Sequence, residues 1–260
     1  MKDLTADEPI HGAPELRPIT SDDLKTALAL GWRDFRSAPV FGLFFAAFYV
    51  CGGIAIMAIL GATGKTWATL PLILGFPLIG PFAAVGLYEV SRRLNTERAL
   101  VWSEVLGVVW RQKDRQLPSI AAIILIFFLF WNFLAHMIFA LFMGLAVMTN
   151  VSSSLEVYFT LNGLTMLCVG TAVGAVFSYL LFALMVFALP MLLDREVDFV
   201  TAMITSFAAV AANLRTLIPW GVLVAVLLLL GMIPAFLGLF IVLPWLGHAT
   251  WHLYARAAHG

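Results

Sequence analysis

Three histidines are the residues of this chain that could most readily hold a cofactor. His248 and His252 are four positions apart, so a helix would place both rings on one face, and His136 lies in another apolar stretch. Two histidines from separate helices can bind one haem iron, and a close pair can contribute to a metal site. However, His136 would lie roughly 27 Å along its helix, near the membrane face opposite to the pair. We therefore predict no metal or other cofactor, with interfacial histidines that hydrogen-bond to neighbouring groups, and keep a haem site as an alternative.

Ionisable side chains also recur where three apolar stretches end, each after a proline and a short apolar run. A charge inside a membrane is costly and is usually paired with an opposite one. One interpretation is a belt of unconnected charges at the membrane surface. The other is a polar cluster at the cytoplasmic end, either a structural ion-pair network or a shallow binding site. The residues concerned are Glu89, Arg92, Arg93, Asp194, Arg195, His248 and His252.

Nucleotide and nucleic-acid binding are not predicted. The segment GATGKT at 61–66 resembles the end of a phosphate-binding loop, but that motif needs a glycine at position 59, where this chain has isoleucine. The 15 basic and 15 acidic residues balance, so no basic surface for nucleic acid is implied. We interpret the segment as a turn.

The composition is that of a protein embedded in lipid. Hydrophobic residues make up 62% of the chain and charged residues 12%, against roughly 45–50% and about 25% in soluble domains. We predict an all-α integral membrane protein with six transmembrane helices, because a helix needs about 20 apolar residues to cross the hydrocarbon. Five spans with a re-entrant last piece are the alternative. The spans are Pro39 to Leu60, Trp67 to Tyr88, Pro118 to Met148, about Leu161 to Leu193, and two within Leu217 to Tyr254, divided by Gly231 and Pro234.

The distribution of positive charge predicts the orientation. Fourteen of the 15 lysines and arginines fall in segments that can share one side of the membrane, and only Lys65 must lie on the other. Cytoplasmic loops carry an excess of lysine and arginine. Both termini are therefore predicted to be cytoplasmic.

The segments before the hairpins predict a threefold plan. Residues 1–20 read as a disordered cytoplasmic tail, and 21–260 as one membrane domain with units of about 21–95, 96–197 and 198–260. Each unit begins with an amphipathic helix that lies at the interface, with its apolar face in the acyl boundary. Each such helix ends in a basic residue shortly before a proline, which suits the first turn of the next helix. These pairs are Arg36 and Pro39, Arg115 and Pro118, and Arg215 and Pro219.

A stripe of small residues runs along the fourth predicted span. Gly170, Gly174 and Ser178 recur at four-residue spacing. Small faces let helices approach closely in lipid. We interpret the stripe as packing within the chain, with a homo-oligomer interface as the alternative.

Four motifs resemble a bacterial family of multi-pass membrane proteins catalogued as domain-of-unknown-function 2189. They are GWRDFRSAP, GPFAAVGLYEVSRRL, LPMLLDREVDFVTAMITSF and LPWLGHATWHLY. The resemblance implies a bacterial inner-membrane protein. Some members of that family are labelled as cytochrome c oxidase subunits. A catalytic oxidase subunit needs six histidines for its haems and copper, and this chain has five in total.

No coherent catalytic arrangement is found in the sequence, so a non-enzymatic role is expected. We predict an accessory or scaffold component that lies in the lipid bilayer and binds a membrane-protein partner or a second copy. A transporter or channel for an uncharged or lipidic solute is one alternative. A haem-binding redox accessory of a respiratory complex is another.

Overall fold

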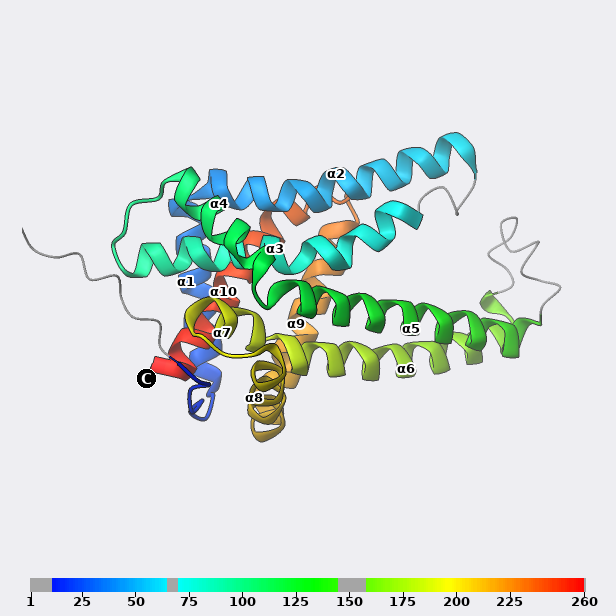
Figure 1. Cartoon of the computed structure of the whole chain (residues 1–260). Coiled ribbons are helices and arrows are strands. Elements are labelled where there is room, and N and C mark those ends of the chain that lie inside the picture. The colour runs from blue at the N-terminus through cyan, green and yellow to red at the C-terminus, as the bar shows by residue number, and fades with distance from the viewer. Residues whose placement is uncertain (1–10, 65–69, 145–157, 260) are drawn as a thin grey trace, which may run out of the picture.

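The computed structural model describes residues 11–64, 70–144 and 158–259, and these are helical with no strand among them. Figure 1 shows the helices. They are α1 (Ser21–Ser37), α2 (Pro39–Thr63), α3 (Leu70–Asn95), α4 (Trp102–Arg111), the 3₁₀ turn η2 (Gln112–Asp114), α5 (Leu117–Met143), α6 (Leu161–Met185), α7 (Ala188–Asp194), α8 (Phe199–Ala212), α9 (Leu214–Met232) and α10 (Leu239–His259).

Four helical segments in the described residues are long and apolar enough to cross a membrane. They are Pro39–Thr63, Leu117–Met143, Leu161–Asp194 and Leu214–Met232. The all-helical membrane architecture is thus confirmed. The second and sixth predicted spans coincide with α3 and α10, which are not among these four. In α10 three histidines and Arg256 interrupt the apolar pattern. The first part of the second predicted span lies outside the described residues.

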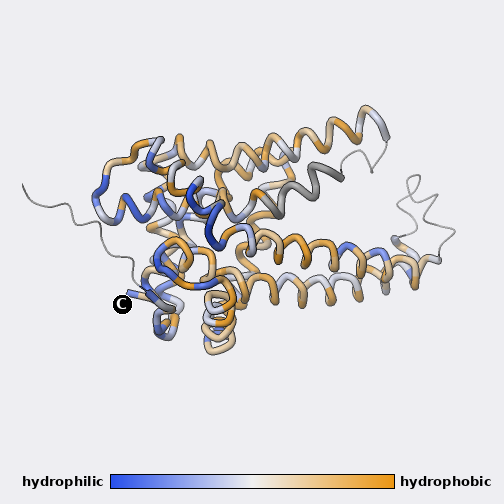
Figure 2. Tube along the Cα trace, viewed as in Figure 1, coloured by the Kyte–Doolittle hydropathy of each residue, from blue (hydrophilic) through white to orange (hydrophobic). Residues whose placement is uncertain are grey.

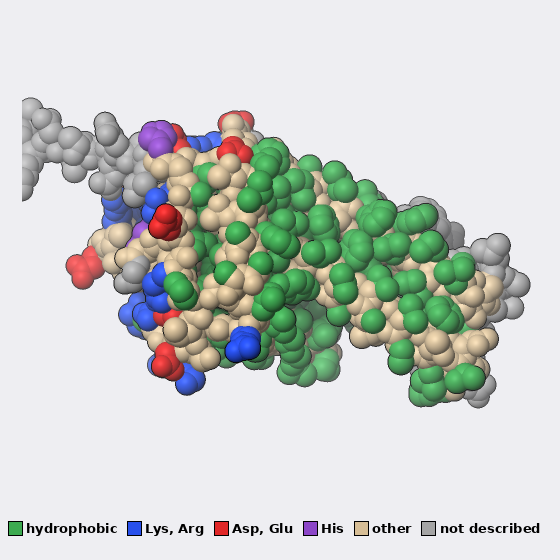
Figure 3. Space-filling model, turned by 90° about the horizontal axis from the view of Figure 1, so that it is seen from below, with side chains coloured by type: hydrophobic (Ala, Val, Ile, Leu, Met, Phe, Trp, Pro, Cys, Tyr) green, Lys and Arg blue, Asp and Glu red, His purple; other side chains and the backbone are tan. Residues whose placement is uncertain are grey.

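The polar and apolar parts of the molecule separate along its length. Helices α2 and α3, and helices α5 and α6, form two hairpins that extend away from the end carrying α1, α4 and the C-terminus (Figure 1). The hairpins are predominantly hydrophobic (Figure 2). Charged side chains gather at the opposite end, and hydrophobic ones cover much of the remaining surface in the view of Figure 3. This is the distribution expected when lipid replaces water around the hairpins.

The three helices expected before the hairpins are present as α1, α4 and α8, but they pack on protein as well as presenting apolar residues outward. Helix α1 begins with a capping box in which Thr20 and Asp23 exchange hydrogen bonds. Its face with Ala27 and Gly31 is buried, chiefly against α10. The prediction of an apolar face in the acyl boundary is therefore wrong for this face of α1.

The prolines follow the predicted plan in two of the three units. Pro39 and Pro118 lie in the first turns of α2 and α5. Pro219 instead lies inside α9, which begins at Leu214. Asn213 ends α8 and flanks α9, so the third junction occurs before the proline and the prediction for Pro219 is wrong.

Residues 11–20 pack against the C-terminal helix. The backbone N–H of Arg17 donates to the carbonyl of Ala257 at 3.0 Å, and that of Ile19 donates to Asn213 Oδ1 at 2.9 Å. Asp23 is buried between the guanidinium groups of Arg17 and Arg256, at 2.7 and 2.9 Å. Where the sequence predicts a disordered tail, the described part of it is a packed segment, because these polar groups find partners far away in sequence. Residues 1–10 lie outside the described residues.

Candidate functional site

The candidate site lies at the charged end, where α1 crosses α10 directly over Gly31. A Cβ atom added to Gly31 would lie 2.5 Å from the backbone nitrogen of Ala249. Only glycine permits this approach, because any side chain would collide with backbone that cannot rotate away. The close crossing brings the last residues of α1 against the histidines of α10.

Replacing Gly31 with valine is therefore expected to destabilise the protein by about 1–3 kcal/mol, the usual range for overpacking. Gly170→Val is the matched control, because a Cβ at Gly170 meets nothing within 4 Å. Thermal unfolding of the purified protein in detergent would compare the two. Equal midpoints for both variants would mean that the α1–α10 crossing adjusts without cost.

His248 and Ser91 form the first part of a buried polar network. Both are fully buried, and Ser91 Oγ on α3 lies 2.8 Å from His248 Nδ1 on α10. Within the described residues His248 Nε2 has no hydrogen-bond partner. A buried ring nitrogen without a partner costs free energy, which the contact of His248 Nδ1 with Ser91 partly offsets.

His252 and Asp34 form the second part. His252 Nε2 lies 2.6 Å from Asp34 Oδ2, and both side chains are at most 3% exposed. Arg33 donates to Asp34 Oδ1 from Nε at 3.2 Å and from Nη2 at 3.0 Å. Asn95 Nδ2, at the end of α3, is 3.5 Å from His252 Nδ1. The carboxylate thus ties α1 to α10, and the histidine contacts α3.

Asp34 is held as a carboxylate by its partners. Burial alone would raise its pKa, but the hydrogen bond and charge of His252, together with Arg33, bring the pKa below its ordinary value. A buried charge is tolerated when it is paired and fully hydrogen-bonded. Asp34 is therefore the electrostatic centre of the junction between α1 and α10.

Glu89 forms a separate ion-pair group on α3. It is fully buried and accepts from Arg93 Nε at 2.6 Å and from Arg92 Nε at 2.7 Å. Arg93 continues to Glu104 on α4 and donates to the carbonyl of Ala99 at 3.1 Å. This chain of charges fixes the connection from α3 to α4.

Asp194 and Arg195 lie in a third group, at the end of α7. Tyr254 donates its hydroxyl to Asp194 Oδ2 at 2.8 Å, and His259 Nε2 lies 3.1 Å from the same oxygen. Arg195 Nε is 3.6 Å from Asp194 Oδ2. The seven residues considered together in the sequence are thus divided among three groups, all of which involve partners that the sequence did not single out.

Sequence reasoning missed Asp34, Ser91, Glu104 and Tyr254. Asp34 is three residues after Gly31 on the same helix, so helical spacing alone places its carboxylate beside Gly31. Ser91 offered no such signal, because a serine between Glu89 and Arg92 reads as an ordinary interfacial residue. Its role depends on which residue of α10 it meets.

The histidines do not converge on one haem. His136 lies on α5, where its Nδ1 is 2.7 Å from the carbonyl of Asn132 and the side chain is exposed. His248 and His252 use ring nitrogens to contact Ser91 and Asp34. No group of three or more potential metal ligands comes together in the part of the chain that the structure describes.

The predicted packing stripe is partly used within the chain. A Cβ atom at Gly174 would lie 2.9 Å from the Trp131 ring of α5, so these two helices pack closely there. Gly170 faces open space and Ser178 is exposed. The stripe contributes to the α5–α6 hairpin at Gly174.

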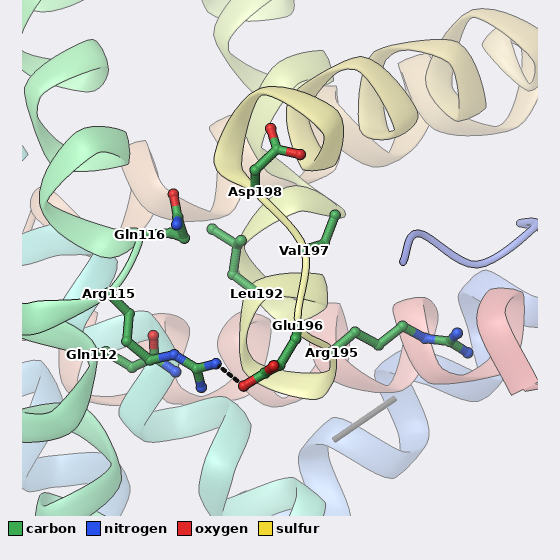
Figure 4. Close-up of a pocket in the computed structure, with 8 residues that line it drawn as sticks. All are labelled: Gln112, Arg115, Gln116, Leu192, Arg195, Glu196, Val197 and Asp198. Carbon is green, nitrogen blue, oxygen red and sulfur yellow. Dashed lines mark hydrogen bonds and ion pairs between the residues drawn. The ribbon is translucent and has the colours of Figure 1, made fainter. Parts of the chain in front are cut away.

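A cavity of about 280 Å³ lies beside the third group, between η2 with the start of α5 and the segment from α7 to α8. Figure 4 shows Arg115 reaching toward Glu196, while the Arg195 side chain extends away from that pair. Arg115 Nη2 and Glu196 Oε1 are 2.6 Å apart. Because opposite charges meet here, the cavity does not favour a ligand of one charge.

The protein-family model described as "Predicted integral membrane protein (DUF2189)" matches residues 69–194. Residues 69–194 belong to this family. The resemblance is thus confirmed over this segment, which runs from the beginning of α3 to the last residue of α7 and contains GPFAAVGLYEVSRRL, whereas GWRDFRSAP and LPWLGHATWHLY lie outside it. It includes Glu89 and Ser91, whereas Asp34, His248 and His252 lie outside it. No curated protein and no solved structure matches the chain significantly.

The chain is an integral membrane protein, as the DUF2189 segment and its apolar helices both indicate. The lipid bilayer is therefore the environment of the exposed hydrophobic residues. The buried polar network joins the DUF2189 segment, through Ser91 and Asn95, to helices α1 and α10 on either side of it.

Proposed function

We propose that this protein is a non-enzymatic scaffold of the bacterial inner membrane. In this proposal six helices cross the membrane, and both termini and the polar network are cytoplasmic. Support comes from the positive charges near that end and from the pairing of its buried acids: Asp34 with His252, and Glu89 with Arg93. These side chains bind one another and stabilise the fold, so we assign them a structural role.

The observation that carries the proposal is the exposure of α5. Only 6% of its apolar 18-residue window is buried within the described structure. Phe130, Phe133, Met137 and Leu141 recur at helical spacing and are 42–75% exposed. A face of this kind is available to lipid and to the helices of another protein. We propose that it binds a partner helix.

A photoreactive amino acid at Phe133 would test this. In native membranes, ultraviolet light should join the protein at Phe133 to one protein of defined mass. The control places the same group at Trp131, two residues away, whose ring packs against Phe177 of α6 at a centroid distance of 6.1 Å. That position should give no intermolecular product. Lipid adducts alone at Phe133 would contradict the scaffold function through α5.

Handling of an uncharged or lipidic solute is a second candidate, because one apolar cavity favours it. This cavity of about 190 Å³ lies among α2, α3, α9 and α10. Its walls include Phe45, Tyr49, Leu87 and Val224. It suits a small apolar group. A transport route would require this cavity to extend across the whole membrane. Measuring the flux of a neutral solute into liposomes that contain the protein would test this function.

A further inference from the structure

A basic cavity lies at the junction between α1 and α2. Its volume is about 360 Å³, and it is lined by Ala29, Trp32, Arg33, Arg36 and Ser37. A water molecule occupies about 30 Å³ in the liquid, so the space accommodates a phosphate group with part of its glycerol. Two guanidinium groups and a hydroxyl line it, and no acidic residue does.

The two arginine side chains differ in the partners that hold them. Arg33 is held by Asp34, itself held by the buried His252. Because Asp34 engages Nε and Nη2, the remaining Nη1 of Arg33 is available to a ligand. Arg36 is exposed, and none of the described residues forms an ion pair or hydrogen bond with its guanidinium. One arginine is thus fixed in place and the other is available to close on an anion.

The surroundings of the cavity are those of a membrane surface. Trp32 is 39% exposed and contacts Trp245 edge to face, at a centroid distance of 5.6 Å. Tryptophan is enriched at the headgroup level of membranes. Helix α2 begins two residues after Ser37 and immediately exposes Val40 and Leu43, at 62% and 41%. A charged cavity therefore adjoins the first residues of an apolar helix.

We propose that this cavity binds the phosphate of an anionic phospholipid, with Arg33 and Arg36 as its direct contacts. Arginine pairs with phosphate through charge-assisted and often bidentate hydrogen bonds. The acyl chains would lie along the exposed apolar surface of α2, which a soluble phosphate could not use. The site does not depend on the scaffold function, since lipid binding at α1 and partner binding at α5 involve different surfaces.

Native mass spectrometry of the full chain in mild detergent would test the site. Phosphatidylglycerol should bind the wild type, and Arg36→Gln should weaken that binding about tenfold, the loss expected for a hydrogen bond between charged groups. Lys25→Gln is the matched control, since it removes one positive charge from the same helix. Lys25 is 78% exposed and pairs with Asp22, outside the cavity. It should leave the binding unchanged.

Three outcomes would overturn the proposal. Equal phosphatidylglycerol binding by the wild type and Arg36→Gln would show that the cavity is not the site. Equal binding of phosphatidylcholine with the same acyl chains would show that the anionic headgroup is not recognised. Displacement by glycerol 3-phosphate at the same concentration as lipid would identify a soluble phosphate as the ligand. Because Arg36 is exposed, its variant should keep the wild-type thermal midpoint, so that a change reports on binding.

Discussion

Replacing Glu89 with alanine is expected to lower the free energy of unfolding by about 3–5 kcal/mol, the usual cost of breaking a buried ion pair. Glu89 is fully buried and lies within 2.7 Å of both Arg92 and Arg93. Its removal leaves the Arg93 side chain, only 10% exposed, without its buried partner. The thermal midpoint in detergent should fall by roughly 10 °C.

Glu104→Ala is the matched control, because Glu104 contacts the same arginine but its own side chain is 56% exposed. Because water screens the exposed Glu104 carboxylate, its pair with Arg93 should contribute about 1 kcal/mol or less, so this variant should unfold close to the wild-type temperature. Equal losses for the two variants would contradict the role given to burial. A small loss for both would mean that Arg93 finds water or another acceptor once Glu89 is gone.

Replacing Asp34 with alanine is expected to cost about 3 kcal/mol, because it leaves buried His252 without its acceptor. The loss should separate α1 from α10, which cross at Gly31. Protease cleavage between α1 and α2 would measure that separation, alongside the thermal midpoint. Asp22→Ala on the same helix removes an acid that is 88% exposed, and both measurements should remain at wild-type values. Undiminished protection of α1 in Asp34→Ala would contradict the proposed tie.

Asp34 also gives this prediction a pH dependence. Its pKa in the folded protein is below the ordinary value of 3.8, because His252 and Arg33 outweigh the effect of burial. A carboxylate of this kind stabilises the fold above about pH 4, and its contribution is lost as the pH falls through the folded-state pKa. Asp34→Ala should therefore lose less of its thermal midpoint than the wild type between about pH 6 and about pH 3. If the thermal midpoints of the variant and the wild type fell in parallel with pH, groups other than Asp34 would cause the acid sensitivity.

The helices α1, α4 and α8 were predictable because their information is local. Capping residues and helical spacing act within one or two turns, so the Thr20–Asp23 start of α1 could be recognised without its neighbours. The buried faces were less predictable. In the sequence, Gly31 is one of several residues on the apolar face of this helix. Its contact with Ala249 depends on a segment more than 200 residues later.

The same limit applies to the candidate site. Glu89 and Arg93 are four residues apart on one helix, so their pairing follows from helical geometry. His252 and Asp34 are 218 positions apart, and nothing in either local sequence indicates the other. His248 and His252 also share a helix face, which suggested a common ligand. Their separate partners, Ser91 and Asp34, became evident only from the packing of α3 and α1 around α10.

The sequence by itself determined that this protein is helical and lies in a membrane, because hydrophobic runs and charge placement act through the solvent and need no partner. It also placed the ionisable residues at the ends of those runs. Only the tertiary structure decided how these residues pair, since a buried charge takes whichever opposite group the packing brings within hydrogen-bonding distance. The junction of α1, α3 and α10, with Asp34 at its centre, exists for that reason.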